Sequence, residues 1–497
     1  MSFVSSSFPL FLVIALLCYF IAPRRFRWRV LLLSSYVFYW FVGGLSAIIV
    51  ISFTVVTVHY SGIWAGRLRN DGAKTTLRRA PLALCLTINF GLLVFLKFSV
   101  YIVPYMGALL ITGISFYTFQ AAGYLIDIYK GKVIPERNIL KTALFLSFFP
   151  QLIQGPISRH SDIAEDLFAG FGWDWERSRS GVQRIIWGYF IKFIIANYAA
   201  PIVDTVFNGY SGFGGTIIIF AVIVYSIQIY ADFAGGISIA LGIAEIVGVK
   251  LPENFRQPFF ATSLADFWRR WHITLGTWLR DYLFYPLALS KPLSKLGRFT
   301  RRVFGNRIGK ILPSSLATFC VYIVVGVWHG SGLNLLAFGI LNGILISVAL
   351  IIEPKMETLR EKTGINGNHP GFWKVFAALR TFVILIFLRY FARAGSLQET
   401  LHMLEHTVFH PRLRELWNGT LLNLGADLRE LIVLAAGTIV LFIRDSIAEQ
   451  GKDCGDLLNE TRPALQFILI LAALVSIVIF SFYSGRALSA TFIYAGL

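Results

Sequence analysis

Long apolar runs recur along the whole chain, and basic segments separate them. Most runs approach the roughly 20 residues that a helix needs to cross a bilayer. Because unpaired backbone groups are costly in lipid, such runs predict helices, and we expect an all-α polytopic membrane protein with about ten to twelve crossings. The expected crossings are Phe8–Ala22, Val30–Val42, Leu45–Val58, Pro81–Val103, Gly107–Ile128, Ile185–Phe207, Gly214–Tyr230, Leu316–His329, Leu333–Ile352, Phe372–Phe391, Leu431–Ile443 and Phe467–Phe482.

Four other stretches fit a partial crossing or an interfacial position better. Leu140–Gly155 is apolar but short and contains Pro150, so we expect a re-entrant segment. Phe233–Val249 is short and rich in glycine, and we expect it to bend within the protein. Phe168–Arg184 is polar and aromatic and Leu397–Trp417 is amphipathic, which is typical of segments that lie at the interface.

The basic segments set the orientation of the crossings. Arginines follow the first run, and further basic segments occur at Arg67–Arg79, Lys130–Lys141 and Lys291–Lys310. Alternation of the crossings puts these segments on one side, which the positive-inside rule identifies as the cytoplasm. On this topology His272 begins on the inner side, and His329 lies toward the outer half.

Composition narrows the class of protein. The chain is 56% hydrophobic and has a formal charge of +18, from 45 basic and 27 acidic residues. A soluble globular protein is not so apolar, and no helical or strand module is left over to bind nucleic acid. We expect a single integral membrane domain, 1–497, with N-terminal spans at 1–139, a core with both histidines at 140–353 and C-terminal spans at 354–497.

The four cysteines predict neither a disulfide framework nor a zinc site. Cys18, Cys85 and Cys320 lie inside apolar runs, and no pair that includes Cys454 or the others has the spacing of metal ligands. The first apolar run lacks a preceding basic segment and a small-residue cleavage site. We therefore expect a retained first span and not a cleaved signal peptide.

Charged and aromatic side chains crowd the stretch Leu251–Pro286. They are Asn254, Arg256, Asp266, Arg269, Arg270, His272, Arg280 and Asp281, interleaved with Trp268, Trp271 and Trp278. Burying such groups near lipid is costly, which favours a functional site. The same mixture fits an interfacial belt, in which Trp lies at headgroup depth and Arg extends to water. The residues alone leave both interpretations open.

Two histidines, His272 and His329, each follow a tryptophan. His329 ends an apolar run, and Gly330 leaves its imidazole open to a close approach. Because an imidazole titrates near neutral pH and could take a proton from an attacking hydroxyl, His329 is a candidate general base. A core histidine bonded to a backbone carbonyl fits as well, and His272 could simply belong to a polar network with the arginines beside it.

Other candidates carry weaker signals. Asp232 is an acid at membrane depth, which either pairs with an arginine or serves the site. Asn254 lies in a loop between two prolines, where a turn explains it as well as chemistry does. His402, His406 and His410 share a helical face and could bind a metal, but no carboxylate completes a ligand set, so we expect no metal site.

Five motifs occur in order along the chain: FPQLIQGPI (149–157), DFAGG (232–236), LPENFRQPF (251–259), DFWRRWHITLGTWLRDYL (266–283) and VWHG (327–330). Together they resemble the membrane-bound O-acyltransferase (MBOAT) family, in particular the bacterial branch typified by the alginate O-acetylation membrane protein and the teichoic-acid D-alanyl transfer protein. With the Y-F-x-x-P-R-R pattern at 19–25, the resemblance covers nearly the whole chain. Beyond Ala288 the chain has a basic segment where alginate-type members continue with a glycine-rich turn.

The resemblance implies a ring of transmembrane helices with re-entrant segments around a central tunnel. It implies no bound cofactor, and an acyl thioester donor, acetyl-CoA or an acyl carrier protein, that enters from the cytoplasm as a substrate. His329 matches the family's essential histidine and is implied to be the base, and His272 matches the second histidine in the inner half of the tunnel. Side chains implied to shape or support the tunnel are Trp268, Trp271, Trp328, Asn254 and Asp281, with Asp232 as a further candidate.

We therefore expect an acyltransferase of the bacterial cytoplasmic membrane that moves an acyl group, taken as acetyl, to a hydroxyl for O-acetylation of an exported cell-surface polysaccharide. The expected partners are an extracytoplasmic acyltransferase protein, the acyl donor or carrier, the polysaccharide and membrane lipids. The nearest alternative is D-alanyl transfer to teichoic acid, in which Lys291–Lys310 could dock an acidic carrier. A transporter or flippase would predict matching inverted repeats, which the sequence lacks, and a scaffold would predict that His329 is dispensable.

Overall fold

The chain folds almost wholly into α-helices in the computed structural model, which describes residues 1–102, 111–363, 370–452, 454–483 and 492–493. Within these ranges the only strand-like pairing is an isolated bridge between Phe255 and Trp271. The contacts divide the chain into two compact units, each assembled from separate stretches of sequence. Unit 1 comprises 1–197, 230–253 and 453–497, and unit 2 comprises 198–229 and 254–452.

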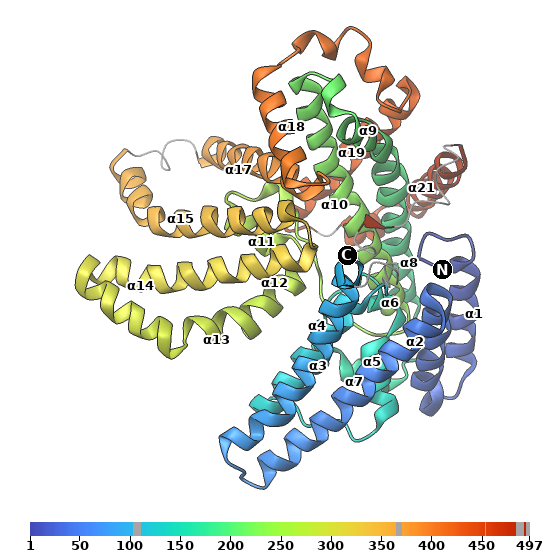
Figure 1. Cartoon of the computed structure of the whole chain (residues 1–497). Helices are drawn as coiled ribbons and strands as arrows, with labels where there is room; N and C mark the ends of the chain where they lie inside the picture. Colours follow the sequence, from blue (N-terminus) through green and yellow to red (C-terminus); the bar gives the residue numbers. More distant parts are fainter. Residues whose placement is uncertain (103–110, 364–369, 453, 484–491, 494–497) are drawn as a thin grey trace. The chain divides into compact units, whose positions relative to one another are not determined.

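Figure 1 labels most of the helices, and α10 passes from unit 2 into unit 1. Those of unit 1 are α1 Phe8–Ile21, α2 Arg27–Asn70, α3 Thr75–Ile102, α4 Ile114–Lys130, α5 Ile139–Ser147, α6 Phe149–Leu152, α7 His160–Ala169, α8 Trp175–Phe190, η3 Ile191–Ala196, α20 Cys454–Glu460 and α21 Pro463–Tyr483. Those of unit 2 are α9 Asn197–Asn208, α10 Gly215–Ile246, α11 Leu264–Arg270, α12 Ile273–Leu279, η6 Arg280–Phe284, α13 Tyr285–Ala288, α14 Lys291–His329, α15 Leu333–Thr363, α17 Pro370–Arg393, α18 Leu397–Phe409 and α19 Leu428–Glu449.

Within the described ranges, nine helices are long and apolar enough to cross a membrane. They are Arg24–Asn70, Thr75–Phe98, Trp175–Asn208, Gly215–Ile246, Gly309–His329, Leu333–Glu353, Gly371–Arg393, Leu428–Glu449 and Pro463–Ser481. Helix α1 is apolar but has only 14 residues. The chain is therefore an all-α polytopic membrane protein, and the fold class predicted from hydropathy is confirmed.

Short helices occupy the stretch in which we expected a segment that does not cross. Helix α5 has nine residues and α6 has four. At 1.5 Å per residue, α5 is about 14 Å long, which is too short to cross the hydrocarbon core of a bilayer. The expected interfacial stretch Phe168–Arg184 divides between the end of α7 and the start of α8, and α8 begins the candidate span Trp175–Asn208.

Two of the longest helices contain a glycine with a non-helical backbone. Gly44, with φ 64° and ψ −155°, divides α2 at the position where we expected one crossing to end and the next to begin. Gly305, with φ 78° and ψ 169°, divides α14 between its basic first part and its apolar second part. The two parts of α14 fold back on each other, and Thr300 Oγ1 in the first part donates a hydrogen bond to the carbonyl oxygen of Gly309 in the second part at 3.4 Å.

The expectation that Phe233–Val249 forms a separate, bent segment is wrong. Helix α10 runs without a break over 32 residues. Its glycines allow α8 to pack closely: a Cβ atom at Gly188 would lie 2.6 Å from the carbonyl oxygen of Gly235, and one at Gly181 would lie 2.6 Å from that of Gly242. Small residues mark close helix contacts in membrane proteins. The glycines of this stretch therefore serve packing and not bending.

Unit 1 has an aromatic core that joins distant parts of the sequence. Phe3, Phe8, Phe38, Phe149 and Phe492 are all buried in one cluster. The ring centroids of Phe3 and Phe492 lie 6.4 Å apart, in an edge-on arrangement. Residues before α1 and residues after α21 therefore pack into the same core.

A buried ion pair lies beside this core. Lys192 belongs to the π-helical turn η3, and its Nζ lies 2.5 Å from Asp232 Oδ1 and 4.8 Å from the centre of the Phe492 ring. The other carboxylate oxygen of Asp232 accepts a hydrogen bond from the N–H of Ile493 at 2.8 Å. Both charged side chains are at most 3% exposed.

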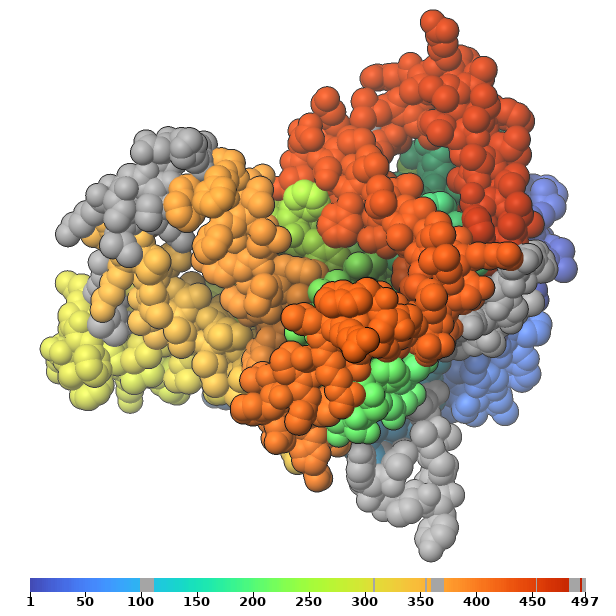
Figure 2. All heavy atoms as spheres, turned by 90° about the horizontal axis from the view of Figure 1, so that it is seen from above, coloured from blue at the N-terminus to red at the C-terminus, as the bar shows by residue number. Residues whose placement is uncertain are grey.

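In unit 2, α14 and α15 form a pair of long helices that lie side by side in Figure 1 and again in the surface view of Figure 2. Glycines let them approach: a Cβ atom at Gly326 would lie 2.7 Å from the carbonyl oxygen of Leu335. This pair carries Trp328 and His329 at the end of α14.

Candidate functional site

A short antiparallel pairing positions His272 between α11 and α12. The N–H of Arg256 donates to the carbonyl of Arg270 at 2.9 Å, and the N–H of Ile273 donates to the carbonyl of Asn254 at 3.0 Å. His272 itself has φ 47° and ψ 53°, a left-handed backbone conformation that residues other than glycine rarely adopt. Strained backbone of this kind clusters at functional sites.

The side chain of Asn254 fixes the orientation of the His272 ring. Asn254 Oδ1 accepts hydrogen bonds from the N–H and the Oγ1 of Thr274, at 3.0 and 2.9 Å, and lies 3.2 Å from His272 Nδ1. An atom that accepts a backbone N–H must be the carbonyl oxygen of the amide, so Nδ1 of His272 is the donor. The neutral ring therefore carries its proton on Nδ1 and its lone pair on Nε2.

Burial keeps this imidazole neutral. His272 lies outside the nine candidate spans and is 3% exposed. Desolvation, with a smaller contribution from the charge of His329, lowers the pKa of His272 from its usual value to about 3. Across the physiological pH range His272 is thus an uncharged group with a defined tautomer.

His272 lies on the wall of a cavity of about 510 Å³ within unit 2. Apolar and aromatic side chains form most of the wall, among them Trp268, Trp271, Leu275, Val321, Tyr322 and Val325. Three arginines, Arg256, Arg269 and Arg280, also line it, and all three are exposed. An apolar cavity with a few fixed polar groups is the usual form of a small-molecule site.

Trp328 links the two histidines. Its ring centroid lies 5.9 Å from that of His272 and 4.8 Å from that of His329. His329 is half-buried, and its ring also packs edge-on against Phe338 at 5.7 Å. The structure thus brings together the two histidines that the sequence singled out from segments more than fifty residues apart.

Two other predicted tryptophans support the same cavity. Trp268 Nε1 donates to Asn342 Oδ1 at 3.0 Å. Trp271 is 2% exposed, stacks on Phe267 with ring centroids 5.5 Å apart, and has the guanidinium of Arg389 5.0 Å from its ring centre. These contacts hold two walls of the cavity in place.

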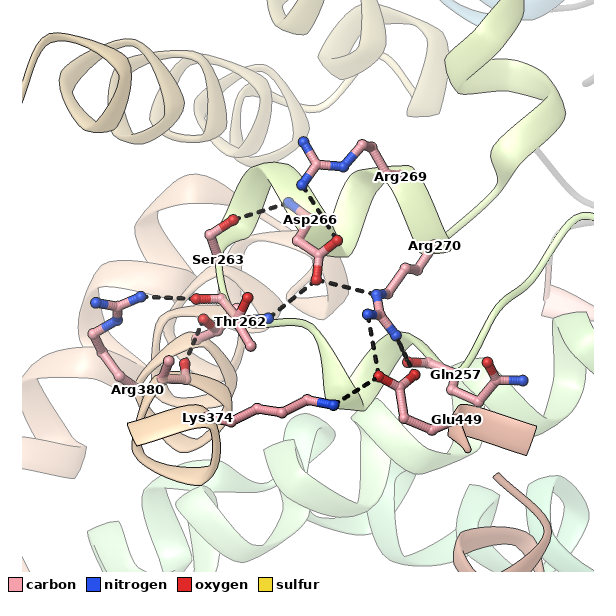
Figure 3. Close-up of polar contacts among 11 residues, drawn as sticks. Gln257, Thr262, Ser263, Asp266, Arg269, Arg270, Lys374, Arg380 and Glu449 are labelled. Carbon is pink, nitrogen blue, oxygen red and sulfur yellow. Dashed lines mark hydrogen bonds and ion pairs between the residues drawn. The ribbon is translucent and has the colours of Figure 1, made fainter. Parts of the chain in front are cut away.

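An ion-pair network holds α11, as Figure 3 shows. Arg270 bonds Asp266 at 3.1 Å and Glu449 of α19 at 2.6 Å, and Lys374 of α17 also reaches Glu449 at 3.3 Å. Burial alone would raise the pKa of Asp266, but the N–H of Thr262 and the charges of its arginine neighbours outweigh this and lower it. The network ties the helix that precedes His272 to two candidate spans.

The remaining predicted residues lie elsewhere. Asp281 pairs with its neighbour Arg280 at 2.8 Å, and it is Arg280 that lines the cavity. Asp232 belongs to unit 1, where it pairs with Lys192. On the exposed helix α18, Nε2 of His406 lies 2.8 Å from the carbonyl oxygen of Phe213.

Sequence reasoning missed several supports of the site. Thr274, Asn342, Arg389 and Glu449 were not singled out. Asn342 and Arg389 carry a readable signal, because a polar side chain within a long apolar helix requires a partner inside the protein. No local pattern marks Glu449, whose partner Arg270 is distant in sequence.

Comparison with known proteins adds to this geometry. The family model described as "MBOAT, membrane-bound O-acyltransferase family" matches residues 136–390. The probable alginate O-acetylase AlgI of Azotobacter vinelandii is 31% identical over 371 residues, which cover 71% of this chain and 69% of the relative. The protein of the same name from Pseudomonas syringae pv. tomato is 29% identical over 92% of this chain and 84% of the relative. The teichoic acid D-alanyltransferase of Bacillus subtilis is 28% identical over 47% of this chain and 58% of the relative.

Proposed function

Because this chain belongs to the membrane-bound O-acyltransferase family, we propose that it transfers an acetyl group from a thioester donor to hydroxyls of an exported cell-surface polysaccharide. The relatives named alginate O-acetylases support both the group and the class of acceptor. The observation that carries the proposal is the cavity wall in unit 2, where His272 is fixed in one tautomer next to Trp328 and His329.

In the proposed reaction, His329 removes the proton of the acceptor hydroxyl as the hydroxyl oxygen attacks the thioester carbonyl carbon. The carbon–sulfur bond then breaks, the ester is formed, and the leaving thiolate takes the proton from the imidazolium of His329. His272 remains neutral at the cavity wall, with its Nδ1 proton held by Asn254. This neutrality lets the uncharged arm of a donor pass without meeting a buried charge.

The cavity lining suits a donor with a long uncharged arm and phosphate groups. Acetyl-CoA and an acylated carrier protein both present their thioester on such an arm. We propose that Arg256, Arg269 and Arg280 supply the positive charge that attracts its phosphates, and that the aromatic wall receives the arm. The basic first part of α14 would face a carrier protein on the cytoplasmic side.

The proposal places the protein in the cytoplasmic membrane of a bacterium, as a multi-pass protein with the donor inside and the acceptor outside. The similarity to bacterial relatives supports this location. Because the acceptor polysaccharide lies outside the membrane, an extracytoplasmic acyltransferase partner would complete the transfer.

The test is the O-acetyl content of cell-surface polysaccharide, measured by mass spectrometry of released polymer. We expect the His329→Ala variant, at matched expression, to lose O-acetylation while polymer export stays normal. His402→Ala is the control, because His402 is an exposed histidine on α18, away from the cavity lining. Retained O-acetylation in the His329→Ala variant would contradict the assignment of the base.

D-alanyl transfer to teichoic acid is the second candidate, because relatives with that name also match this chain. It predicts ester-linked D-alanine in the envelope of cells with the wild-type protein and no added O-acetyl groups. Assaying both esters in the same samples separates the two functions.

A further inference from the structure

The first part of α14, residues 291–304, is a basic helix. Its cations are all exposed, namely Lys291, Lys295, Arg298, Arg301 and Arg302. Within the described residues, none of these cations belongs to an ion pair. The sequence has no Asp or Glu between Asp281 and Glu353 that could neutralise them locally. This positive charge is therefore available to a partner outside the chain.

Most of these cations form a stripe along one side of the helix. The stripe consists of Lys291, Lys295, Arg298 and Arg302. Their spacing of four, three and four residues places them within a sector of about 60° at 3.6 residues per turn. On the opposite side, Leu293, Gly297 and Thr300 are buried, and a Cβ atom at Gly297 would lie 3.2 Å from Pro313 Cγ in the second part of α14. The cationic stripe therefore points away from the second part of the helix.

Apolar side chains lie beside the cationic stripe. Phe299 and Val303 directly follow Arg298 and Arg302 in sequence, so they lie on the flank of the stripe. They are 61% and 55% exposed, and the removal of such side chains from water is favourable. A carrier protein would cover them only while it is bound, whereas a bilayer covers them at all times. The exposed apolar flank therefore favours a lipid surface over an acidic carrier protein.

The cationic stripe lies beside the start of a candidate membrane span. The second part of α14 contains the span Gly309–His329. Thr300 of the first part is bonded to Gly309 at the beginning of that span, so the two residues lie at the same level. Basic residues next to spans gather on the cytoplasmic side, where the leaflet carries anionic lipids, and long Lys and Arg side chains extend to headgroup depth. The cationic stripe is therefore within reach of phospholipid headgroups.

We propose that the cationic stripe of α14 binds anionic phospholipid headgroups, as in phosphatidylglycerol, while Phe299 and Val303 lie among the acyl chains. The guanidinium groups of Arg298 and Arg302, one turn apart, donate hydrogen bonds to phosphate oxygens, and the two lysines of the stripe add positive charge. Phosphatidylcholine also has a phosphate, but its own quaternary ammonium cancels the charge, so it gains less from the stripe. This binding does not depend on the proposed acyl transfer.

The bound lipid steadies one wall of the cavity in unit 2. The second part of α14 contributes Val321, Tyr322 and Val325 to that wall. The first part packs against the beginning of the second part through Gly297 and Thr300. Anionic lipid at the stripe therefore holds the hairpin that carries the cavity wall, without contacting the cavity itself.

The test is lipid binding to the full-length protein, purified in detergent and depleted of lipid. Phosphatidylglycerol and phosphatidylcholine with the same acyl chains are titrated, and bound lipid is measured by native mass spectrometry. We expect phosphatidylglycerol to bind about tenfold more tightly, and the double variant Arg298→Gln, Arg302→Gln to lose this preference. The matched control is Arg67→Gln, Lys74→Gln, which removes two exposed cations from another basic segment predicted on the same side of the membrane and should keep the preference.

Hydrogen exchange of the backbone amides of residues 291–304 locates the binding. We expect slower exchange in nanodiscs that contain phosphatidylglycerol than in nanodiscs of phosphatidylcholine, an effect that Arg298→Lys, Arg302→Lys keeps and the double glutamine variant loses. Equal binding of the two lipids, or an equal loss in the control variant, would overturn the proposal. Displacement of the lipid by inorganic phosphate would overturn it in favour of a free-anion site. Protection of these amides by an acidic acyl carrier protein, and not by phosphatidylglycerol, would overturn it in favour of carrier docking.

Discussion

The pair Lys192–Asp232 of unit 1 and the pair His272–Asn254 of unit 2 are alike in that each buries two polar side chains, but they differ in what surrounds them. One carboxylate oxygen of Asp232 pairs with Lys192, and the other accepts a hydrogen bond from the N–H of Ile493. The pair is therefore enclosed by protein partners in a packed core. Asn254 holds one edge of His272, and the ring lies on a cavity wall. The first pair is enclosed by its protein partners, whereas the second pair borders a cavity.

The largest expected change in stability is at the pair Lys192–Asp232, which is enclosed by protein. Lys192→Met leaves the carboxylate of Asp232 buried without its cation, and we expect a loss of about 3–5 kcal/mol in the free energy of unfolding. Unfolding in mixed micelles measures it. The double variant Lys192→Met, Asp232→Asn keeps an oxygen that accepts the N–H of Ile493, so it should recover most of the loss and keep transferase activity. If the double variant is stable but inactive, the pair is not merely structural.

A substitution in the ion-pair network around α11 should cost less stability than Lys192→Met. Arg270→Met removes the side chain that joins Asp266 to Glu449, and we expect a loss of about 1.5–3 kcal/mol, typical of hydrogen bonds to charged groups. Arg269→Met is a matched control, because Arg269 bonds the same Asp266 but is 68% exposed, so its loss should stay below about 1 kcal/mol. Equal losses in the two variants would show that burial does not decide the strength of these pairs.

A comparable or smaller effect on stability, with a specific effect on rate, is expected at the cavity. Asn254→Ala leaves the N–H of Thr274 and the Nδ1 proton of His272 without their acceptor, at a cost of about 1–3 kcal/mol. We expect kcat to fall more than KM changes, because the ring of His272 loses its orientation. Asn254→Asp keeps the accepting oxygen and should restore much of the stability. A change in KM alone would count against a positioning role.

The smallest expected effect is the pH dependence of stability that His272 contributes. Its pKa is about 3 in the folded protein and about 6.5 in the unfolded chain, so below pH 6.5 the unfolded chain binds a proton that the folded protein does not. Stability therefore falls as the pH falls from about 6.5 toward 3, by about 1.4 kcal/mol at pH 5.5. The His272→Gln variant should lack this slope in unfolding measurements between pH 7 and 5. An identical slope in the variant would show that folding does not lower the pKa of His272.

Hydropathy predicted the fold class because each crossing depends on a property of about 20 consecutive residues. The prediction failed at α10, because glycines in a sequence can mark either a bend or a close contact between helices. Here Gly181 and Gly188 of α8 lie against the glycines of α10, which shows that these glycines serve a close contact. The pair of histidines was recognisable from sequence, whereas the left-handed backbone of His272 follows from pairing with residues near Asn254. Partners that come from distant segments, such as Asn342 for Trp268, have no local pattern.

The contact between Phe3 and Phe492 has a consequence for biosynthesis. The core around Phe38 takes side chains from the two far parts of the chain, so it cannot close when the first helices enter the membrane. Until the ribosome has passed Ile493, Asp232 also lacks one of its two hydrogen-bond donors. Assembly of unit 1 is therefore completed only after Phe492 and Ile493 have been translated, and an interrupted product would expose an unfinished core to the quality-control proteases of the membrane.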